Sequence, residues 1–548
     1  MAITSVESVP ITDKIEASPP KARLRPRRTL NRLALGLAGL TVAALGQLFF
    51  SLESLGDGLL CYGLAVILFT WALAGRLYPH HSPLPPGQPA MQLSRWPGIW
   101  RFNFGVWLIL LAVTISFFAF NFLPNDDARR LVWWLYLASL LVLISGGLLL
   151  ARDRSWQAEL RHLLPNRAIA LGLLTVLGLA VVLRLYQLDQ LPFGIWFDEA
   201  EAGLEARRML AEPTYRPVFH MPINITGHLL AVYAMALAWL GDSIVSMRLV
   251  SVLFGLGGVL AAYLFGRELR GPRFGLILAF LVAVARWHLN FSRIAMTGID
   301  TPFFEFLSLF FLIRLLRRGR LRDALWAGLG LGFGLVFYTA FRLFVLALLI
   351  FAVLAGLVWV IQRVRTRAAW ATGGKATSPD QAGVRPSSAQ PPSWLERWLI
   401  FLPQHGTGWS LLGQVTVLLV STWLVTMPIA KFALDNPAAF RFRTDQVSIL
   451  ARRDQPDLGR ALWSNTAKHL LMFNYKGDGN GRHNLPGTPM LDPAMAILAV
   501  LGLGLVLARP HYPGNAFFLL LFVLALMGGI FSVDFEAPQS LRSIAVLP

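Results

Sequence analysis

Apolar runs recur along almost the whole chain, and about a dozen of them approach the length of a membrane-spanning helix. Such a helix needs about 20 mainly apolar residues to cross the hydrocarbon core of a bilayer. Hydrophobic residues make up 55% of the 548 residues, charged residues only 14%, and the mean hydropathy is +0.56. The core of a water-soluble domain cannot bury so much apolar surface. The sequence therefore predicts an all-α fold, a polytopic transmembrane bundle of about thirteen spans.

The run from His228 to Leu240 is too short for a span and suits an interfacial or re-entrant helix. If it lies on the outer surface, the basic segments 266–273, 314–322 and 362–408 all fall on the cytoplasmic side, as the positive-inside rule prefers. We expect the spans near residues 30–50, 57–75, 104–123, 131–150, 168–186, 247–266, 274–291, 302–316, 323–340, 342–361, 409–430, 491–508 and 515–533.

Composition divides the chain into five regions. They are a basic cytoplasmic tail (1–29), a four-helix transmembrane extension (30–166), a transmembrane module with an outer loop at 187–246 (167–361), a basic cytoplasmic linker of low complexity (362–408), and C-terminal helices with an outer loop at 431–490 (409–548). The sequence ends at Pro548, at the start of another apolar run, as expected for a truncated product.

Lys and Arg outnumber Asp and Glu by 49 to 30, which gives a formal net charge of +19. In a membrane protein, basic loops fix topology and external basic groups hold phosphates, so we expect no nucleic-acid partner. The single cysteine, Cys61, excludes a disulfide framework and a thiolate zinc cluster. No phosphate-binding loop, dinucleotide fingerprint or Ser-His-Asp signature occurs in the sequence, which disfavours those chemistries.

Four acidic residues crowd the outer loop that follows the expected span 168–186: Asp198, Glu199, Glu201 and Glu205. They could simply begin a solvated helix, because carboxylates near a helix N-terminus complement its dipole. Trp196 and its apolar neighbours, however, place an aromatic surface beside the acids. Such a surface is expected where a carboxylate meets a bound substrate at a membrane interface. We therefore favour a catalytic role for this loop.

The Asp198-Glu199 pair, followed by Ala200 and a predicted helix, resembles the GT-C superfamily of membrane glycosyltransferases. The resemblance is to glycosyltransferase family 39, the branch of the protein O-mannosyltransferases and the lipid A aminoarabinose transferase. Related enzymes place another acid at the outer mouth of a helix, where Asp300 follows the segment 290–299. Residues 338–342 and 473–487 also match, and the resemblance covers the chain from about residue 168 to its end.

By this resemblance, the chain is an outward-facing transferase of the bacterial plasma membrane, and Asp198 is the base that deprotonates the acceptor hydroxyl. Its partners would be a polyprenyl-phosphate-linked sugar donor, membrane lipid, and a lipid, glycan or protein acceptor. Glu199 and Asp300 complete the expected catalytic group. Asp300 would orient the base, orient the acceptor or help to bind a metal. Whether the reaction uses a divalent metal ion stays open, because related enzymes differ in using one.

A lipid-linked donor presents an anion at headgroup depth, and its leaving phosphate gathers charge as the sugar bond breaks. We therefore expect basic side chains at headgroup depth, where they can bind this phosphate. The candidates for phosphate binding are Arg293, Arg342, Lys476 and Arg482. The candidates for other substrate contacts are Glu201, Trp196, Tyr338, His483 and Asn484.

Simpler interpretations of the same residues remain. Arginines at helix ends commonly reach toward lipid headgroups, and the loop 474–487 could be only a surface turn. A single base would suit one displacement with inversion, since the phosphate leaves without an acid. The rival class is a polytopic transporter or flippase of a lipid-linked or polar substrate, and a non-catalytic scaffold is a third alternative.

Overall fold

The computed structural model describes residues 26–73, 99–122, 129–150, 163–371, 408–452, 457–510 and 512–548. Most of the expected tail 1–29 and linker 362–408 lies outside these residues. Every expected span is mostly helical where the structure describes it, and the predicted all-α class is confirmed. Among the described residues, eight helices are long and apolar enough to cross a membrane. The chain is thus a multi-pass membrane protein, while the count of about thirteen spans stays a prediction.

The element bounds follow the hydrophobic pattern closely. The long helices are α1 (Pro26–Ser51), α2 (Leu55–Leu73), α3 (Ile99–Phe122), α4 (Arg129–Leu150), α6 (Arg167–Leu185), α9 (Ile244–Arg270), α10 (Pro272–Val284), α12 (Asp300–Arg318), α13 (Leu321–Phe337), α14 (Phe341–Ala371), α16 (Gly408–Asp435), α19 (Pro493–Ala508) and α20 (Pro513–Ile530). The shorter elements are α7 (Phe197–Ala211), α8 (Gly227–Leu240), α11 (Arg286–Phe291), α17 (Pro437–Val447), α18 (Leu458–Leu471), the two-residue strands β1 (Phe219–His220) and β2 (Ile225–Thr226), and the 3-10 turns η3 (Ile449–Ala451), η4 (Asp534–Glu536) and η5 (Ile544–Val546).

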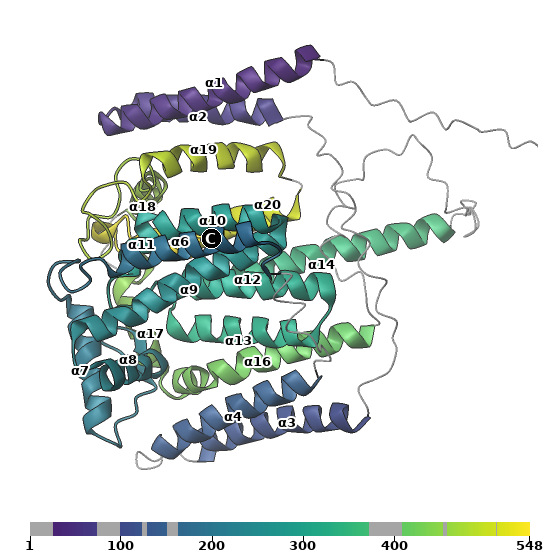
Figure 1. Cartoon of the computed structure of the whole chain (residues 1–548), viewed down its shortest axis with the longest axis vertical. Coiled ribbons are helices and arrows are strands. Elements are labelled where there is room, and N and C mark those ends of the chain that lie inside the picture. The colour runs from purple at the N-terminus through teal and green to yellow at the C-terminus, as the bar shows by residue number, and fades with distance from the viewer. Residues whose placement is uncertain are drawn as a thin grey trace, which may run out of the picture.

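The long helices lie side by side in a stack (Figure 1). At its centre, α9 packs against α10 and α12, α12 against α13, and α13 against α16. Small residues permit close approach of these backbones: a Cβ added at Gly328 on α13 would lie 2.4 Å from the carbonyl oxygen of Leu418 on α16. Close approach of small residues is a usual means of helix association in membranes, where lipid competes with apolar side chains.

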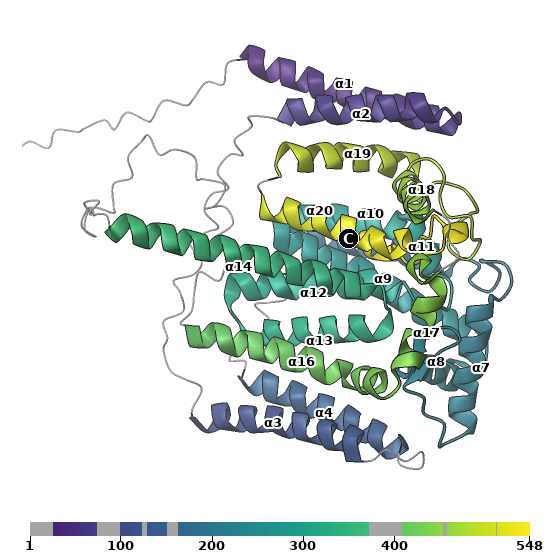
Figure 2. The ribbon, with the colours of Figure 1, turned by 180° about the vertical axis from the view of Figure 1, so that it is seen from behind.

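The first four helices form two hairpins at opposite edges of this stack (Figures 1 and 2). Helices α1 and α2 pack against each other and against α19. Helices α3 and α4 pack against each other and against α16, and α4 also packs against α13. The four-helix region expected at 30–166 is therefore two separate pairs.

Four short helices, α7, α8, α17 and α18, gather at one end of the stack, which we call the site end (Figure 2). Helix α8 packs on α7 there, so the run from His228 to Leu240 lies among the short helices of the site end. At the opposite end, Glu268 near the end of α9 pairs with Arg317 and Arg318 at the end of α12.

The segment 274–291, expected as one span, is divided at Ala285 into α10 and α11. Ala285 has φ −57° and ψ 115°, which is outside the helical region. No proline stands at the break, so its cause is tertiary. The Arg184 guanidinium, from the last turn of α6, donates a hydrogen bond of 3.1 Å to the carbonyl oxygen of Ala283. This bond satisfies a helix-end carbonyl in a buried position.

Candidate active site

The acidic loop delivers Asp198 and Glu199 to the first turn of α7. The Glu199 carboxylate accepts a hydrogen bond of 3.3 Å from the backbone N–H of Trp196 and so caps the helix. The Asp198 side chain is 21% exposed, whereas the Glu199 side chain is fully buried. Two adjacent carboxylates therefore have opposite environments.

Glu199 forms a buried ion pair with Arg248 of α9. The Nε and Nη2 atoms of Arg248 each donate to the carboxylate at 3.0 Å, and the backbone N–H of Ala295 donates to it at 2.8 Å. Arg248 also donates to the carbonyl oxygens of Leu188 and Gly194, at 3.0 and 2.7 Å. This pair fixes the loop before α7 onto α9, so the structure uses Glu199 as a positioning residue for its neighbour.

Asp198 pairs with Arg482, which lies 284 residues away. Arg482 belongs to the loop between α18 and α19, residues 472–492, which we call the late loop. The Arg482 Nε also faces Asn480, whose Oδ1 is 3.4 Å away. A Cβ added at Gly481 would lie 3.5 Å from the Trp196 ring, so this loop covers the start of α7. The structure thus brings together three predicted site residues: Asp198, Trp196 and Arg482.

Asp478 anchors the late loop. Its carboxylate accepts hydrogen bonds from the Asn480 backbone N–H at 2.8 Å, from His483 Nδ1 at 2.8 Å, and from the Ser540 backbone and hydroxyl at 2.9 and 2.8 Å. Burial raises the pKa of Asp478, but the hydrogen bond from His483 and the other donors outweigh it, and the net pKa is lowered. His483 therefore supports the loop as a hydrogen-bond donor.

His483 and Asn484 each keep one buried polar atom, Nε2 and Oδ1, without a hydrogen-bond partner among the described residues. Lys476 is exposed, with its ammonium 5.6 Å from the centroid of the Tyr475 ring. These three residues share the loop that carries Arg482, but only Lys476 is exposed, whereas His483 and Asn484 are buried within the loop.

Asp300 begins α12 and is buried. Its Oδ1 accepts a hydrogen bond of 2.8 Å from the backbone N–H of Gly298, while Oδ2 has no partner in the described part of the chain. Burial raises the pKa of Tyr338, which lies just after α13, and the charges of Arg542, Asp300 and Asp198 also act on it. Tyr338 shares a buried cluster with Ile299, the residue that precedes Asp300.

A pocket opens beside Tyr338. Arg342 and Thr339 line it from the start of α14, and Phe219, Asn224 and Thr226 line it from the β1–β2 hairpin. The Arg342 guanidinium lies 4.8 Å from the centroid of the Phe440 ring. The pocket thus brings together one cation, hydroxyl groups and aromatic walls, and its free space is about that of one water molecule.

Arg293 has a different environment from the other predicted cations. Its guanidinium donates to the carbonyl oxygens of Leu183, Gln187 and Leu191, at 2.6, 3.3 and 3.2 Å. These carbonyls belong to the last turn of α6 and the loop that follows it. Because its donors are occupied by backbone, the structure uses Arg293 to close the end of α6.

Two further charged residues, the half-buried Arg542 and the buried Glu305, were not foreseen from the sequence. Arg542 pairs with Glu536 through Nη2 at 2.7 Å, while its buried Nη1 has no hydrogen-bond partner among the described residues. Glu305 lies on α12 behind Asp300, with both carboxylate oxygens buried and without hydrogen-bond partners there. Arg542 lies in a short polar loop with no recognisable motif, so only its positive charge could have identified it as a candidate site residue.

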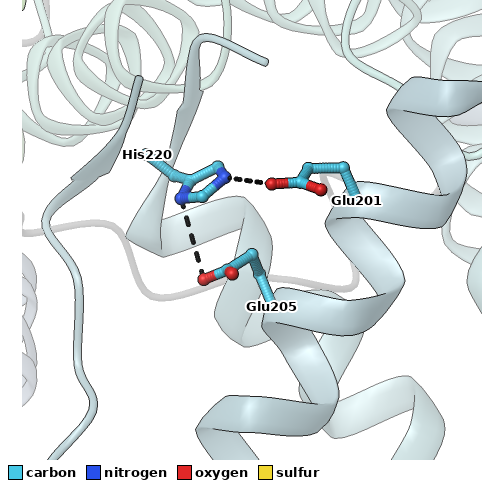
Figure 3. Close-up of side chains that lie close together, drawn as sticks. All are labelled: Glu201, Glu205 and His220. Carbon is cyan, nitrogen blue, oxygen red and sulfur yellow. Dashed lines mark hydrogen bonds and ion pairs between the residues drawn. The ribbon is translucent and has the colours of Figure 1, made fainter. Parts of the chain in front are cut away.

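Glu201 contacts His220 rather than any of these groups. The distance from His220 Nε2 to Glu201 Oε1 is 2.9 Å, and Glu205 lies on the other side of the imidazole (Figure 3). The grouping was not predicted, although the four-residue spacing of the two glutamates on one helix face is visible in the sequence.

Residues 227–375 match the family model described as dolichyl-phosphate-mannose-protein mannosyltransferase. The match confirms the predicted resemblance to GT-C membrane glycosyltransferases. The mannosyltransferase-like segment includes Asp300, Tyr338 and Arg342, whereas Asp198 lies before it. No curated protein sequence matches the chain.

Among solved structures, the chain is similar to the archaeal oligosaccharyltransferase AglB from Archaeoglobus fulgidus in complex with an inhibitory peptide and a dolichol-phosphate. The identity is 14%, the TM-score is 0.38, and the alignment covers 72% of this chain and 50% of that one. The Archaeoglobus fulgidus oligosaccharyltransferase in the apo form gives 15% identity and a TM-score of 0.35, over 69% of this chain and 49% of that one. The chain therefore spans about half the length of these proteins.

Proposed function

We propose that this chain is a membrane glycosyltransferase that moves a sugar from a polyprenyl-phosphate donor to an acceptor on the outer face of a bacterial plasma membrane, with inversion. The observation that carries the proposal is the partly exposed Asp198–Arg482 pair, which lies at the start of α7. The matched family's name, which cites a dolichyl-phosphate-linked mannose donor, supports the same donor class.

In this proposal, Asp198 and Arg482 neutralise each other until the donor binds. The donor phosphate then competes for the Arg482 guanidinium, because Arg pairs with phosphate through strong charge-assisted hydrogen bonds. Displacement of Arg482 frees the Asp198 carboxylate to accept the proton of the acceptor hydroxyl. Donor binding and activation of the base are thereby coupled through one arginine.

The reaction is a single displacement. The acceptor oxygen attacks the anomeric carbon as its proton passes to Asp198, and the bond from that carbon to the phosphate oxygen breaks. The bond pair leaves with the phosphate, where the charge of Arg482 and the free Nη1 of Arg542 stabilise it. Arg342 and Lys476 would bind the rest of the donor headgroup. Asp300 and Tyr338 would position the acceptor.

A polytopic transporter of a lipid-linked substrate is the second candidate. Asp300 Oδ2 and both carboxylate oxygens of Glu305, all on α12 and buried without hydrogen-bond partners among the described residues, favour it, because membrane-buried carboxylates often mark transport pathways. A transporter would move the substrate without changing it chemically, so detection of a glycosylated product separates the two functions.

The decisive experiment uses purified protein in lipid nanodiscs with a panel of polyprenyl-phosphate sugars and acceptors, and detects products by mass spectrometry. We expect transfer from at least one donor. Asp198→Asn should reduce the rate by at least about a hundredfold, in the range for loss of a general base. Asp242→Asn is the matched control, because Asp242 pairs with Arg207 on the exposed surface. Equal rates in wild type and Asp198→Asn would contradict the proposal.

A further inference from the structure

Three side chains outside the proposed reaction centre converge on one point between α7 and the β1–β2 hairpin. Glu201 and Glu205 stand one turn apart on α7, and His220 reaches them from β1 (Figure 3). His220 Nε2 lies 2.9 Å from Glu201 Oε1, and Nδ1 lies 3.7 Å from Glu205 Oε2. One potential ligand atom from each residue lies within 4.8 Å of the other two.

Neither carboxylate forms a direct ion pair with a lysine or arginine in the described part of the chain. Arg208 pairs directly with Glu212 and acts on Glu205 only through longer-range charge attraction. All three side chains are largely shielded, with exposed fractions of 25% for Glu201, 13% for Glu205 and 15% for His220. Shielded like charges that share one imidazole repel each other, so an added cation would be favoured.

A fourth residue orients the cluster. The Tyr215 hydroxyl donates a hydrogen bond to Glu205 Oε2. Such outer contacts are typical of metal sites, where they fix the direction of a carboxylate ligand.

We propose that Glu201, Glu205 and His220 bind a divalent first-row transition metal, with Zn²⁺ as the best fit. Imidazole nitrogen with carboxylate oxygens is a common zinc ligand set, and three protein ligands leave a position for water. Ligand atoms at about 2.0–2.2 Å from Zn²⁺ stand roughly 3–4 Å apart, so small side-chain rotations close the site.

The metal would join two elements that flank the reaction centre. Helix α7 carries Asp198 in its first turn, and the β1–β2 hairpin carries Phe219, Asn224 and Thr226 into the pocket beside Arg342. Phe219 directly precedes His220 and packs on Phe432 and Phe440, with ring centroids 5.4 and 6.0 Å apart. A bound ion would therefore fix the position of the β1–β2 hairpin, which lines the pocket, relative to Asp198 on α7.

The same three residues also allow an arrangement without a metal ion. A protonated His220 could donate to both glutamates and satisfy the cluster without an ion. That arrangement needs no metal, so direct measurement of bound metal separates the two.

The test uses tag-free protein in nanodiscs, stripped with chelator and titrated with ZnCl₂ against a chromophoric competitor. We expect one Zn²⁺ per chain, counted by mass spectrometry, and an upward shift of the unfolding temperature on binding. His220→Gln and the double variant Glu201→Gln/Glu205→Gln should each weaken binding by at least about tenfold, and Tyr215→Phe by less. Glu212→Gln, directly after the same helix, should bind as wild type does.

Far-UV circular dichroism and gel filtration establish that each variant is folded. Absence of bound Zn²⁺ in wild type would overturn the inference in favour of a protonated histidine. Unchanged binding in His220→Gln, with loss in Asp198→Asn, would overturn it in favour of a metal at the reaction centre. Metal binding does not depend on sugar transfer, so failure of the proposed transferase activity would leave this result intact.

Discussion

Asp198 and Glu199 are neighbours in sequence, but their contacts assign them different tasks. Glu199 is buried against Arg248, 49 residues away, and Asp198 meets Arg482, 284 residues away, at a partly exposed surface. The sequence predicted the position of the acidic pair from its aromatic surroundings. The sequence could not predict that Asp198 and Glu199 have different roles, because no local pattern links Arg482 to Asp198 or Arg248 to Glu199.

Removal of the Glu199 carboxylate should destabilise the protein far more than removal of its neighbour. Glu199→Ala leaves the Arg248 charge buried without its partner, which typically costs about 3–5 kcal/mol. Asp198→Ala breaks a partly exposed pair and should cost about 0–1 kcal/mol. Unfolding of both variants in the same detergent, followed by intrinsic fluorescence, measures the difference. Equal stability of the two variants would contradict a positioning role for Glu199.

At the scale of elements, hydrophobic runs predicted the helices well, because the bilayer requires every spanning backbone to satisfy its own hydrogen bonds. The break at Ala285 was not predicted, since it depends on Arg184 from a different helix. The docking of the first helices was not predicted either. Tyr62 of α2 accepts a hydrogen bond of 2.9 Å from Asn474, at the start of the late loop.

The contact between Tyr62 and Asn474 makes the first helix pair a support for the loop that carries Arg482. Tyr62→Phe removes the hydroxyl and leaves the ring, so we expect a loss of about 0.5–1.5 kcal/mol and faster hydrogen exchange in residues 474–487. Thr41→Val is the control, because the Thr41 hydroxyl bonds only within α1, to the carbonyl oxygen of Leu37. Exchange in the loop that rises equally in both variants would show that α1 and α2 do not support it.

At the scale of the whole molecule, the two ends of the helix stack differ in charge and architecture. Short helices and the candidate site occupy one end, and the arginines that pair with Glu268 occupy the other. Clusters of arginine on one side are typical of the cytoplasmic face. We therefore propose that the site end faces outward.

Cysteine labelling tests this orientation. In a Cys61→Ser background, Asp189→Cys marks the exposed loop at the site end, and Arg273→Cys marks the exposed turn between α9 and α10 at the opposite end. A membrane-impermeant maleimide added to intact cells should label the Asp189→Cys protein only. Labelling of the Arg273→Cys protein alone would reverse the orientation.

The central claim is that Arg482 and Arg542 hold the phosphate of a lipid-linked donor beside Asp198. Equilibrium binding of a sugar-free polyprenyl phosphate to nanodisc-embedded protein tests it most directly. We predict that Arg482→Gln and Arg542→Gln each weaken binding by about tenfold or more, since each removes a charge-assisted contact. Arg207→Gln, which alters an exposed pair far from the late loop in sequence, should have no effect. Unchanged affinity in both Arg482→Gln and Arg542→Gln would contradict the account.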